Sequence, residues 1–288
     1  MCSVLAIVCA ACACISPAPT AKLAATKNFP KSVEPLEKNS LMDELWKTLE
    51  EALANQPVND GRSAETHLAR GIMLDESRQY KEAIRQFGEA IRLRADFADA
   101  YDHRGSAHFK LGHIKESIED FDRYLKLQPK EEPGHWRRGI AFYYAGRFQE
   151  GKKQFEAYQQ VDRNDVENAV WSYLCMARTD GVAKARAAML KVGQDRRVPM
   201  TEIYGLFAGR AAPRDVLAAA EAAKPSAEEQ NLRLFYAHLY LGLYYESLGD
   251  RRQTAEHIGL AAEKYPVKGY MGDVARVHWD LLRRKAPP

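Results

Sequence analysis

The stretch AYDHRGSAHFKLGHIKESIEDFDRYLKLQP, residues 100–129, decides the fold of this 288-residue chain. Within it, Gly105 and Phe121 each recur at a spacing of 34 residues in both directions. The matching residues are Gly71 and Gly139 for the glycine, and Phe87 and Phe155 for the phenylalanine. A fixed period of this length indicates an array of repeated units, each too small to bury its apolar face alone.

Three further columns keep the same register. Their members are Arg70, Arg104 and Arg138; Ala83, Ser117 and Gly151; and Ala90, Tyr124 and Tyr158. We expect the repeated glycine to let the two helices of a unit approach closely, with the small-residue column opposite it and the phenylalanine filling the space between units. Gly112 and Gly146 stand in equivalent turns, where glycine adopts the left-handed conformation that ends a helix.

Residues 100–129 resemble a unit of the tetratricopeptide repeat family, whose period is about 34 residues. The resemblance implies an all-α fold, an α-solenoid of stacked helix-turn-helix repeats in a right-handed superhelix. We expect three clear repeats over 64–162, a degenerate repeat with short helices over 163–232, and a closing repeat with a capping helix over 233–286. In the closing repeat, Gly242 takes the place of the repeated glycine, and the final helix should cover the open end of the stack.

The first 63 residues predict a targeting segment, a linker and a helix. Residues 1–21 contain no Asp, Glu, Lys or Arg and include an apolar run of signal-peptide length. Small residues before Cys12 resemble a bacterial lipoprotein processing site, so Cys12 is the candidate lipid anchor, with Cys14 or simple cleavage of the leader as alternatives. Residues 22–40 should form a flexible linker and residues 41–63 an N-terminal helix. We expect an exported, periplasmic, membrane-anchored lipoprotein, or a cytoplasmic protein if the leader does not function.

The layout also resembles that of NlpI-type bacterial lipoproteins. The stretches that carry this resemblance are RRGIAFYYAGR (137–147), NDVENAVWSYL (164–174) and FYAHLYLGLYYESLGD (235–250). The resemblance implies a lipid-anchored periplasmic adaptor that docks a protease to a cell-wall hydrolase, usually as a homodimer.

The first helix of each repeat should line a concave groove, because positions three to four residues apart share one helix face. This groove is expected to be acidic at one end and aromatic at the other, a surface that suits a peptide with basic and apolar side chains. Trp and Tyr dominate binding energy at interfaces, which favours Trp136, Tyr143 and Tyr144. The candidate partner-binding residues are Leu68, Ile72, Asp75, Asp99, Asp102, Phe109, Lys110, Trp136, Ile140, Tyr143 and Tyr144.

Composition and motifs argue against an enzyme or a nucleic-acid binder. The chain has 42 basic and 39 acidic residues, a balance that predicts no nucleic-acid partner. It contains no nucleotide-binding glycine motif, no metalloprotease motif and no nucleophile elbow, and its eight histidines are scattered. We therefore expect no catalytic residues, no metal and no cofactor.

Cys175 lies in an apolar helical run and is expected to be a buried, inert thiol. Each arginine of the column is expected to pair with an acidic side chain or with carbonyls of the neighbouring repeat, with anion binding as the alternative.

The sequence thus predicts a non-enzymatic adaptor or scaffold that binds peptides or other proteins in a concave helical groove. Two hypotheses of other classes remain. One is a structural subunit of a larger envelope assembly, which would use edge or convex surfaces. The other is a hydrolase, in which the acidic pair Asp99 and Asp102 would do the chemistry.

Overall fold

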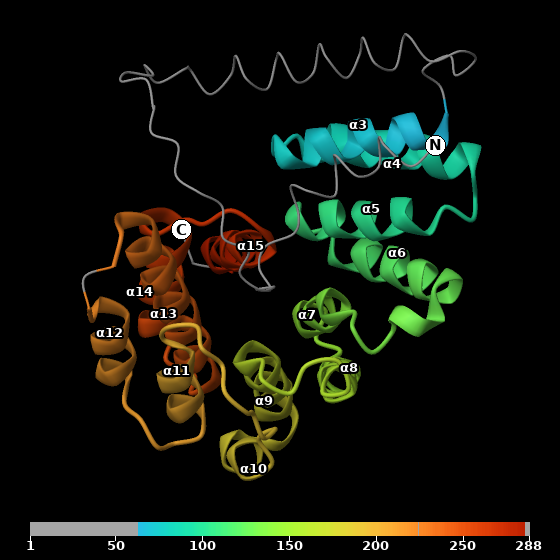
Figure 1. Ribbon diagram of the computed structural model, residues 1–288. Helices are drawn as coiled ribbons and strands as arrows, with labels where there is room; N and C mark the ends of the chain where they lie inside the picture. Colours follow the sequence, from blue (N-terminus) through green and yellow to red (C-terminus); the bar gives the residue numbers. More distant parts are fainter. Residues whose placement is uncertain (1–62, 224, 286–288) are drawn as a thin grey trace, which may run out of the picture. The chain divides into compact units, whose positions relative to one another are not determined.

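The computed structural model describes residues 63–223 and 225–285, and all regular structure in those ranges is helical (Figure 1). The expected leader and linker, the expected helix over 41–63 except for Ser63, and the candidate lipid anchor Cys12 lie outside the described residues. The first six helices are α3 (Ala64–Glu76), α4 (Tyr80–Leu93), α5 (Ala98–Lys110), α6 (Ile114–Leu127), α7 (Trp136–Tyr144) and α8 (Phe148–Tyr158). Neighbours along the chain pack against each other, which gives the all-α solenoid that the period predicts.

The repeated glycine and phenylalanine meet inside each helix pair. A Cβ atom on Gly105 would lie 2.9 Å from the Phe121 ring, and one on Gly71 would lie 2.4 Å from the Phe87 ring. Carbon atoms in contact need about 3.5–4.0 Å, so no larger residue fits there without moving the ring. The 34-residue spacing therefore arises from the close packing of the two helices in each pair. The closing pair has an equivalent contact, because a Cβ atom on Gly242 would lie 2.6 Å from the Ile258 side chain.

The turns inside the pairs also follow the repeat. Gly112 and Gly146 have φ of +76° and +74°, as expected for the residue that ends a helix in the left-handed region. Gly249 does the same in the closing pair, with φ of +78°. In the first pair Arg78 takes this place with φ of 60°, so the turn keeps its shape without a glycine.

The regular pattern weakens after α8. The helix α9 (Val166–Asp180) is long and buried, but its partner α10 (Val182–Ala187) has only six residues, and residues 188–199 are largely irregular. Tyr173 occupies the place of the repeated glycine, and its ring packs edge-on against Phe207 at 5.1 Å. A tyrosine thus fills the space that the glycine leaves open in the regular pairs, and α9 packs against both α10 and α11 (Met200–Phe207).

The C-terminal region closes with four elements and a short π-helical turn. These are α12 (Pro213–Glu221), α13 (Ala227–Ser247), α14 (Arg251–Gly259), η2 (Leu260–Lys264) and α15 (Tyr270–Lys285). The sequence predicted that the final helix would cap the open end of the stack. In fact α15 contacts α5 as well as α14 and η2. Its polar side chains reach residues of the first two repeats, so it bridges distant repeats and does more than cover the last one.

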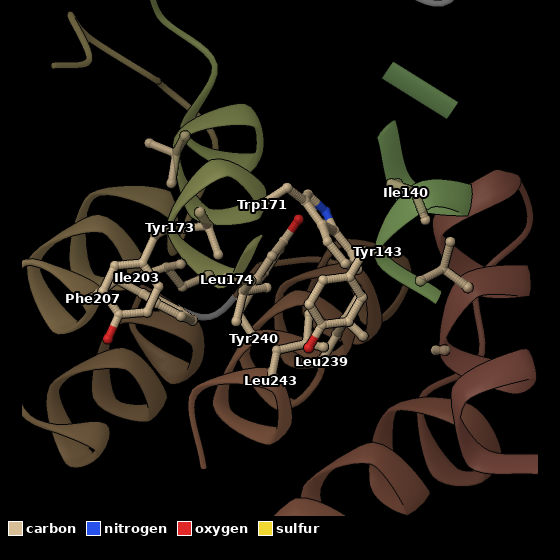
Figure 2. Close-up of a cluster of buried hydrophobic side chains, with 14 of the residues drawn as sticks. Ile140, Tyr143, Trp171, Tyr173, Leu174, Ile203, Phe207, Leu239, Tyr240 and Leu243 are labelled. Carbon is tan, nitrogen blue, oxygen red and sulfur yellow. The ribbon is translucent and has the colours of Figure 1, made fainter. Parts of the chain in front are cut away.

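Two clusters of buried side chains form the core. The smaller one contains Ala83, Phe87 and Ala107. The larger one runs from Phe109 to Val277, and Figure 2 shows its part around Trp171, Tyr143 and Tyr240. Cys175 is fully buried within it, and burial raises the pKa of its thiol to about 12. The burial of this thiol, as expected from the sequence, is thus confirmed. Within the described ranges, no helix is both long and apolar enough to span a bilayer.

Candidate functional site

The side chains predicted to line the groove in the first repeat are partly buried in contacts within the chain. Leu68 and Ile72 on α3 are half-buried against the smaller core cluster. Asp75, at the end of the same helix, accepts a 2.5 Å hydrogen bond from the ammonium of Lys110. Lys110 also lies 3.9 Å from Asp273 of α15. Two of the predicted binding residues therefore form an internal network with the C-terminal helix.

Tyr80 and Arg276 extend this network. The Tyr80 hydroxyl donates to Asp273 at 2.9 Å, and Arg276 of α15 donates to the backbone carbonyl of Lys110 at 2.8 Å. Burial and the neighbouring Asp273 carboxylate raise the pKa of Tyr80 to about 12. These contacts join α15 to the first two repeats through charge and hydrogen bonds, in addition to the stacking of Tyr270 on Phe109.

Asp102 is likewise paired within the chain. The Arg137 guanidinium donates to it at 2.6 Å, and His135 Nε2 lies 2.9 Å from its other oxygen. His135 Nδ1 accepts the Arg138 amide at the start of α7, so Nε2 is the nitrogen that donates. Burial opposes ionisation, but the His135 hydrogen bond and the Arg137 charge outweigh it and lower the pKa of Asp102 to about 2. Asp99, by contrast, is exposed, and it shares none of these contacts.

The aromatic positions are mostly covered by the chain itself. Phe109 is fully buried and stacks on Tyr270 with ring centroids 5.2 Å apart. Tyr143 is 6% exposed and donates to Glu246 at 2.7 Å, while the Tyr144 hydroxyl lies 3.0 Å from His278 Nδ1. Ile140 is also buried. The expectation of an open groove along all three repeats is therefore corrected: α15 and α13 contact its aromatic end, and Phe109, Ile140 and Tyr143 offer almost no surface to a partner.

One part of the predicted aromatic end remains open. A cavity of about 380 Å³ lies beside Trp136 and Ile140, and we call it the aromatic cavity. Its ring-bearing walls are Trp136, Phe155, Trp171, Tyr236 and Tyr270. The Trp136 and Tyr270 rings meet edge to face at 5.2 Å, which fixes one wall between α7 and α15. Leu232 and Lys268 are exposed lining residues and stand at its rim.

A charged cluster forms one side of the aromatic cavity. Arg197, from the irregular segment after α10, binds Glu167 at 2.6 Å, Asp165 at 2.7 Å and Asp195 at 2.6 Å. Glu167 also accepts a 2.5 Å hydrogen bond from Tyr240. Burial raises the pKa of Asp165 and of Glu167, and the single Arg197 charge does not fully offset it. Three carboxylates thus share one guanidinium at the edge of an aromatic space.

Three buried polar atoms in the cavity lining have no hydrogen-bond partner among the described residues: Asn168 Oδ1, Trp171 Nε1 and the Tyr270 hydroxyl. Asn168 and Trp171 are only 2% exposed. Figure 2 shows the Trp171 ring with its nitrogen on the edge toward Ile140, another lining residue. Unpaired buried polar groups are rare and costly, so their position in a cavity wall points to a ligand.

Sequence reasoning found part of this site and missed the rest. It selected Trp136 and Ile140 from the helix periodicity of the third repeat. It missed Glu167, Asn168, Trp171 and Tyr270, whose role depends on how α9 and α15 fold back. Arg197 follows Glu167 by 30 residues through an irregular segment, and no periodic signal connects the two.

The remaining sequence predictions concern ion pairs and metals. Arg104 forms a two-bond pair with Asp120 at 2.7 and 2.8 Å, and Arg138 binds Gln154, Asp122 and Glu132. Pairing with the neighbouring repeat is therefore confirmed at Arg138, through Asp122, whereas Arg104 pairs within its own repeat. Across the described ranges, no group of three or more His, Cys, Asp or Glu side chains is placed to hold a metal ion.

Comparison with known proteins identifies the repeats. Residues 76–112 match a family model described as TPR repeat, and residues 98–131 match one described as Tetratricopeptide repeat. No curated protein matches the chain. The solved structures that it resembles include a tetratricopeptide repeat protein from Parabacteroides merdae, with 13% identity, coverage of 85% of this chain and 93% of that one, and a TM-score of 0.52. YrrB, described as a TPR protein with an unusual peptide-binding site, has 14% identity, coverage of 82% and 98%, and a TM-score of 0.44. At 13% identity, the likeness to the Parabacteroides merdae structure concerns the fold alone.

Proposed function

We propose that this chain is a non-enzymatic adaptor that binds a peptide segment of another protein, and that the aromatic cavity is where the segment docks. Tetratricopeptide repeats are typically interaction modules without catalytic activity, which supports the adaptor role. The cavity adds a place for the partner, because Trp136 and Tyr270 offer aromatic surface beside a space that the chain leaves open.

One observation carries the choice of site. Of the predicted concave residues, Phe109, Ile140 and Tyr143 are buried and Lys110 and Asp102 are paired within the chain. Trp136 instead borders open space, together with buried polar atoms that lack partners. Binding sites are concave, largely apolar and supplied with a few placed polar groups, and the aromatic cavity has all three properties.

Site-specific photo-crosslinking tests this proposal. A photoreactive amino acid at Leu232, which lines the aromatic cavity and is 44% exposed, should crosslink a partner in cells. The same group at Leu248 provides a matched control, because Leu248 is 47% exposed but does not line the cavity. Crosslinks at Leu232 and none at Leu248 support the proposal. Equal crosslinking at both, or crosslinks at Leu248 alone, would contradict it.

We also propose that the adaptor works in the bacterial cell envelope as a lipoprotein, as the resemblance to NlpI-type proteins and the residues around Cys12 suggest. Intact-mass measurement of protein extracted from membranes should show a diacylglyceryl-sized addition, and Cys12→Ser should abolish it. A mature N-terminus near Lys22 without lipid would reject the anchor. The homodimer that this resemblance implies predicts twice the monomer mass by light scattering.

A further inference from the structure

Three unpaired atoms lie in the wall of the aromatic cavity, and two of them, Asn168 Oδ1 and Trp171 Nε1, define what a ligand must offer, because the third, the Tyr270 hydroxyl, can either donate or accept. Asn168 Nδ2 donates to the Phe155 carbonyl at 2.9 Å, which fixes the orientation of the amide because only the NH2 group can face a carbonyl. Asn168 Oδ1 is therefore a buried acceptor without a donor. Trp171 Nε1 is a donor only, and it lacks an acceptor. A matching ligand brings at least one N–H group and one carbonyl-type oxygen.

The charged residues around the cavity favour a positively charged ligand. Asp165, Glu167 and Asp195 contact a single cation, Arg197, so this cluster carries an excess of two negative charges when all are ionised. Lys268 also lines the cavity, but its side chain is exposed and solvent screens its charge. Burial raises the pKa of Asp165 and Glu167, which is the response expected of carboxylates short of positive charge.

An anionic ligand does not fit this wall. Arg197 is the cation that it would need, yet each nitrogen of its guanidinium already donates to a carboxylate: Nε to Asp195, Nη1 to Glu167, and Nη2 to both Asp165 and Asp195. A carboxylate or phosphate in the cavity would also face Asp165 and Glu167 at close range. Like charges placed together cost free energy in a partly buried site.

The aromatic walls suit the stem and the head of a basic side chain. Trp136, Trp171, Tyr236 and Tyr270 enclose the space from α7, α9, α13 and α15. Ring faces attract a cation within about 6 Å, most strongly for Trp and Tyr. The methylene stem of a lysine or arginine packs on the same rings while its charged head remains near polar groups.

We propose that the aromatic cavity binds the lysine or arginine side chain of an extended peptide, with Asn168 Oδ1 accepting from the charged head and Trp171 Nε1 donating to a peptide carbonyl. This inference rests on the proposed function, since it names the chemistry of the segment that the adaptor holds. The acidic cluster around Arg197 supplies the long-range attraction, and the rings supply the contact surface.

Four short peptides of the form Ac-Gly-Val-X-Leu-Gly-NH2 test the inference, with X as Lys, Arg, norleucine or Glu. Binding to the full chain is measured by calorimetry and by the emission of the cavity tryptophans at low salt. The Lys and Arg peptides should bind at least tenfold more tightly than the norleucine peptide, and the Glu peptide should bind weakest. Their advantage should shrink as salt is added, because the attraction is in part electrostatic.

Two variants with matched controls link the effect to the site. Asp165 caps the start of α9 by accepting from the Glu167 amide, and Asp250 caps α14 in the same way. Asp165→Asn should reduce Lys-peptide affinity about fivefold and leave the norleucine peptide unchanged, whereas Asp250→Asn should change neither. Trp171→Phe removes the unpaired N–H group and should weaken all the peptides. Its control is Trp279→Phe, because Trp279 donates to Glu263 away from the cavity.

The outcomes separate this inference from the proposed function. If the four peptides bind equally, or only the Glu peptide binds, the basic-side-chain inference is wrong while peptide binding stands. If none binds but Leu232 still crosslinks a protein, the cavity takes a partner of other chemistry and the inference again fails. If none binds and Leu232 gives no crosslink, both fail. Equally tight binding of free n-butylammonium would make the site one for small amines and overturn the peptide assignment.

Discussion

The helix pairs from α3 to α8 and the region from α9 to α15 are built on different principles. In the first region, a glycine packs against a phenylalanine ring once every 34 residues. The smaller core cluster, which contains Ala83, Phe87 and Ala107, also lies there. In the second region helix lengths vary from six residues in α10 to 21 in α13, and most of the larger core cluster lies there.

The difference between the regular and the irregular region indicates where a binding site can arise in a repeat protein. A regular stack presents the same face again and again, and its polar groups are satisfied by neighbouring repeats, as the Arg104–Asp120 pair illustrates. The irregular region brings α9, α13 and α15 onto α7, and that meeting leaves the aromatic cavity with unpaired polar atoms. The aromatic cavity therefore lies between α7 of the regular repeats and α9, α13 and α15 of the irregular region.

Removal of α15 should have the largest effect on this comparison. A chain ending at Gly269 loses the buried side chains of Val274 and Val277 and uncovers Phe109. At about 1.5–3 kcal/mol for each large apolar side chain, the loss of unfolding free energy should reach about 5 kcal/mol. Hydrogen exchange should accelerate in α5, although α5 is far from α15 in sequence. Unchanged exchange in α5 would contradict the bridging contact.

Equivalent core phenylalanines should behave differently in the two core clusters. Phe155→Ala opens a hole in the larger core cluster and should lower the free energy of global unfolding by about 3–5 kcal/mol in urea titration. Phe87→Ala removes the same ring from the smaller cluster, so much of its effect should appear as faster hydrogen exchange confined to α3 and α4. If both variants unfold with the same probe-independent transition, the two regions form one cooperative unit.

Lys110 should matter far more than its neighbour Lys115. Lys110→Met leaves the half-buried Asp75 without its cation, while Asp273 keeps Arg276 at 3.2 Å, and it should cost about 2–4 kcal/mol in thermal or urea unfolding. Lys115 is 84% exposed and only 3.7 Å from Glu119, so Lys115→Met should change stability by less than about 0.5 kcal/mol. Equal costs for the two variants would mean that the network does not join α15 to the first repeats.

A histidine pair in the closing region should make stability depend on pH. His238 and His257 are buried with their Nδ1 atoms 2.8 Å apart, and burial, with the neighbouring His257, lowers the pKa of His238 to about 4. Because the folded pKa lies below the usual 6.5, the unfolded chain binds more protons between these values. Stability is therefore full above pH 6.5 and falls as the pH drops toward 4, by about 1–3 kcal/mol.

Variants of single histidines check this dependence. His257→Gln should flatten the decline of urea midpoints between pH 6.5 and pH 4. His113→Gln, at an exposed position, should leave the decline as it is in the parent chain. An unchanged slope in His257→Gln would show that other groups carry the pH dependence.

The regular region could be predicted from sequence because its signal is periodic. The spacing of Gly71, Gly105 and Gly139 predicts the helix pairs, because each glycine leaves space for one phenylalanine ring in its own pair. The bridge from α15 could not be predicted in the same way. Its contacts, such as Tyr80 with Asp273, join residues 193 positions apart, and no local pattern specifies such a pairing. The helix periodicity therefore singled out Trp136, which lines the aromatic cavity, but it did not predict the helices that cover the groove or the cavity wall at Asn168 and Trp171.

Hydrogen exchange of the adaptor bound to its crosslinked partner tests the central claim most directly. We expect partner binding to slow exchange in the amides around Asn168 and Tyr236 and in the segment before α15. Exchange in α3, around Leu68 and Ile72, should stay as in the free chain. Protection of α3 with no change around Asn168 would contradict the account, because it would place the partner on the regular repeats and leave the aromatic cavity unused.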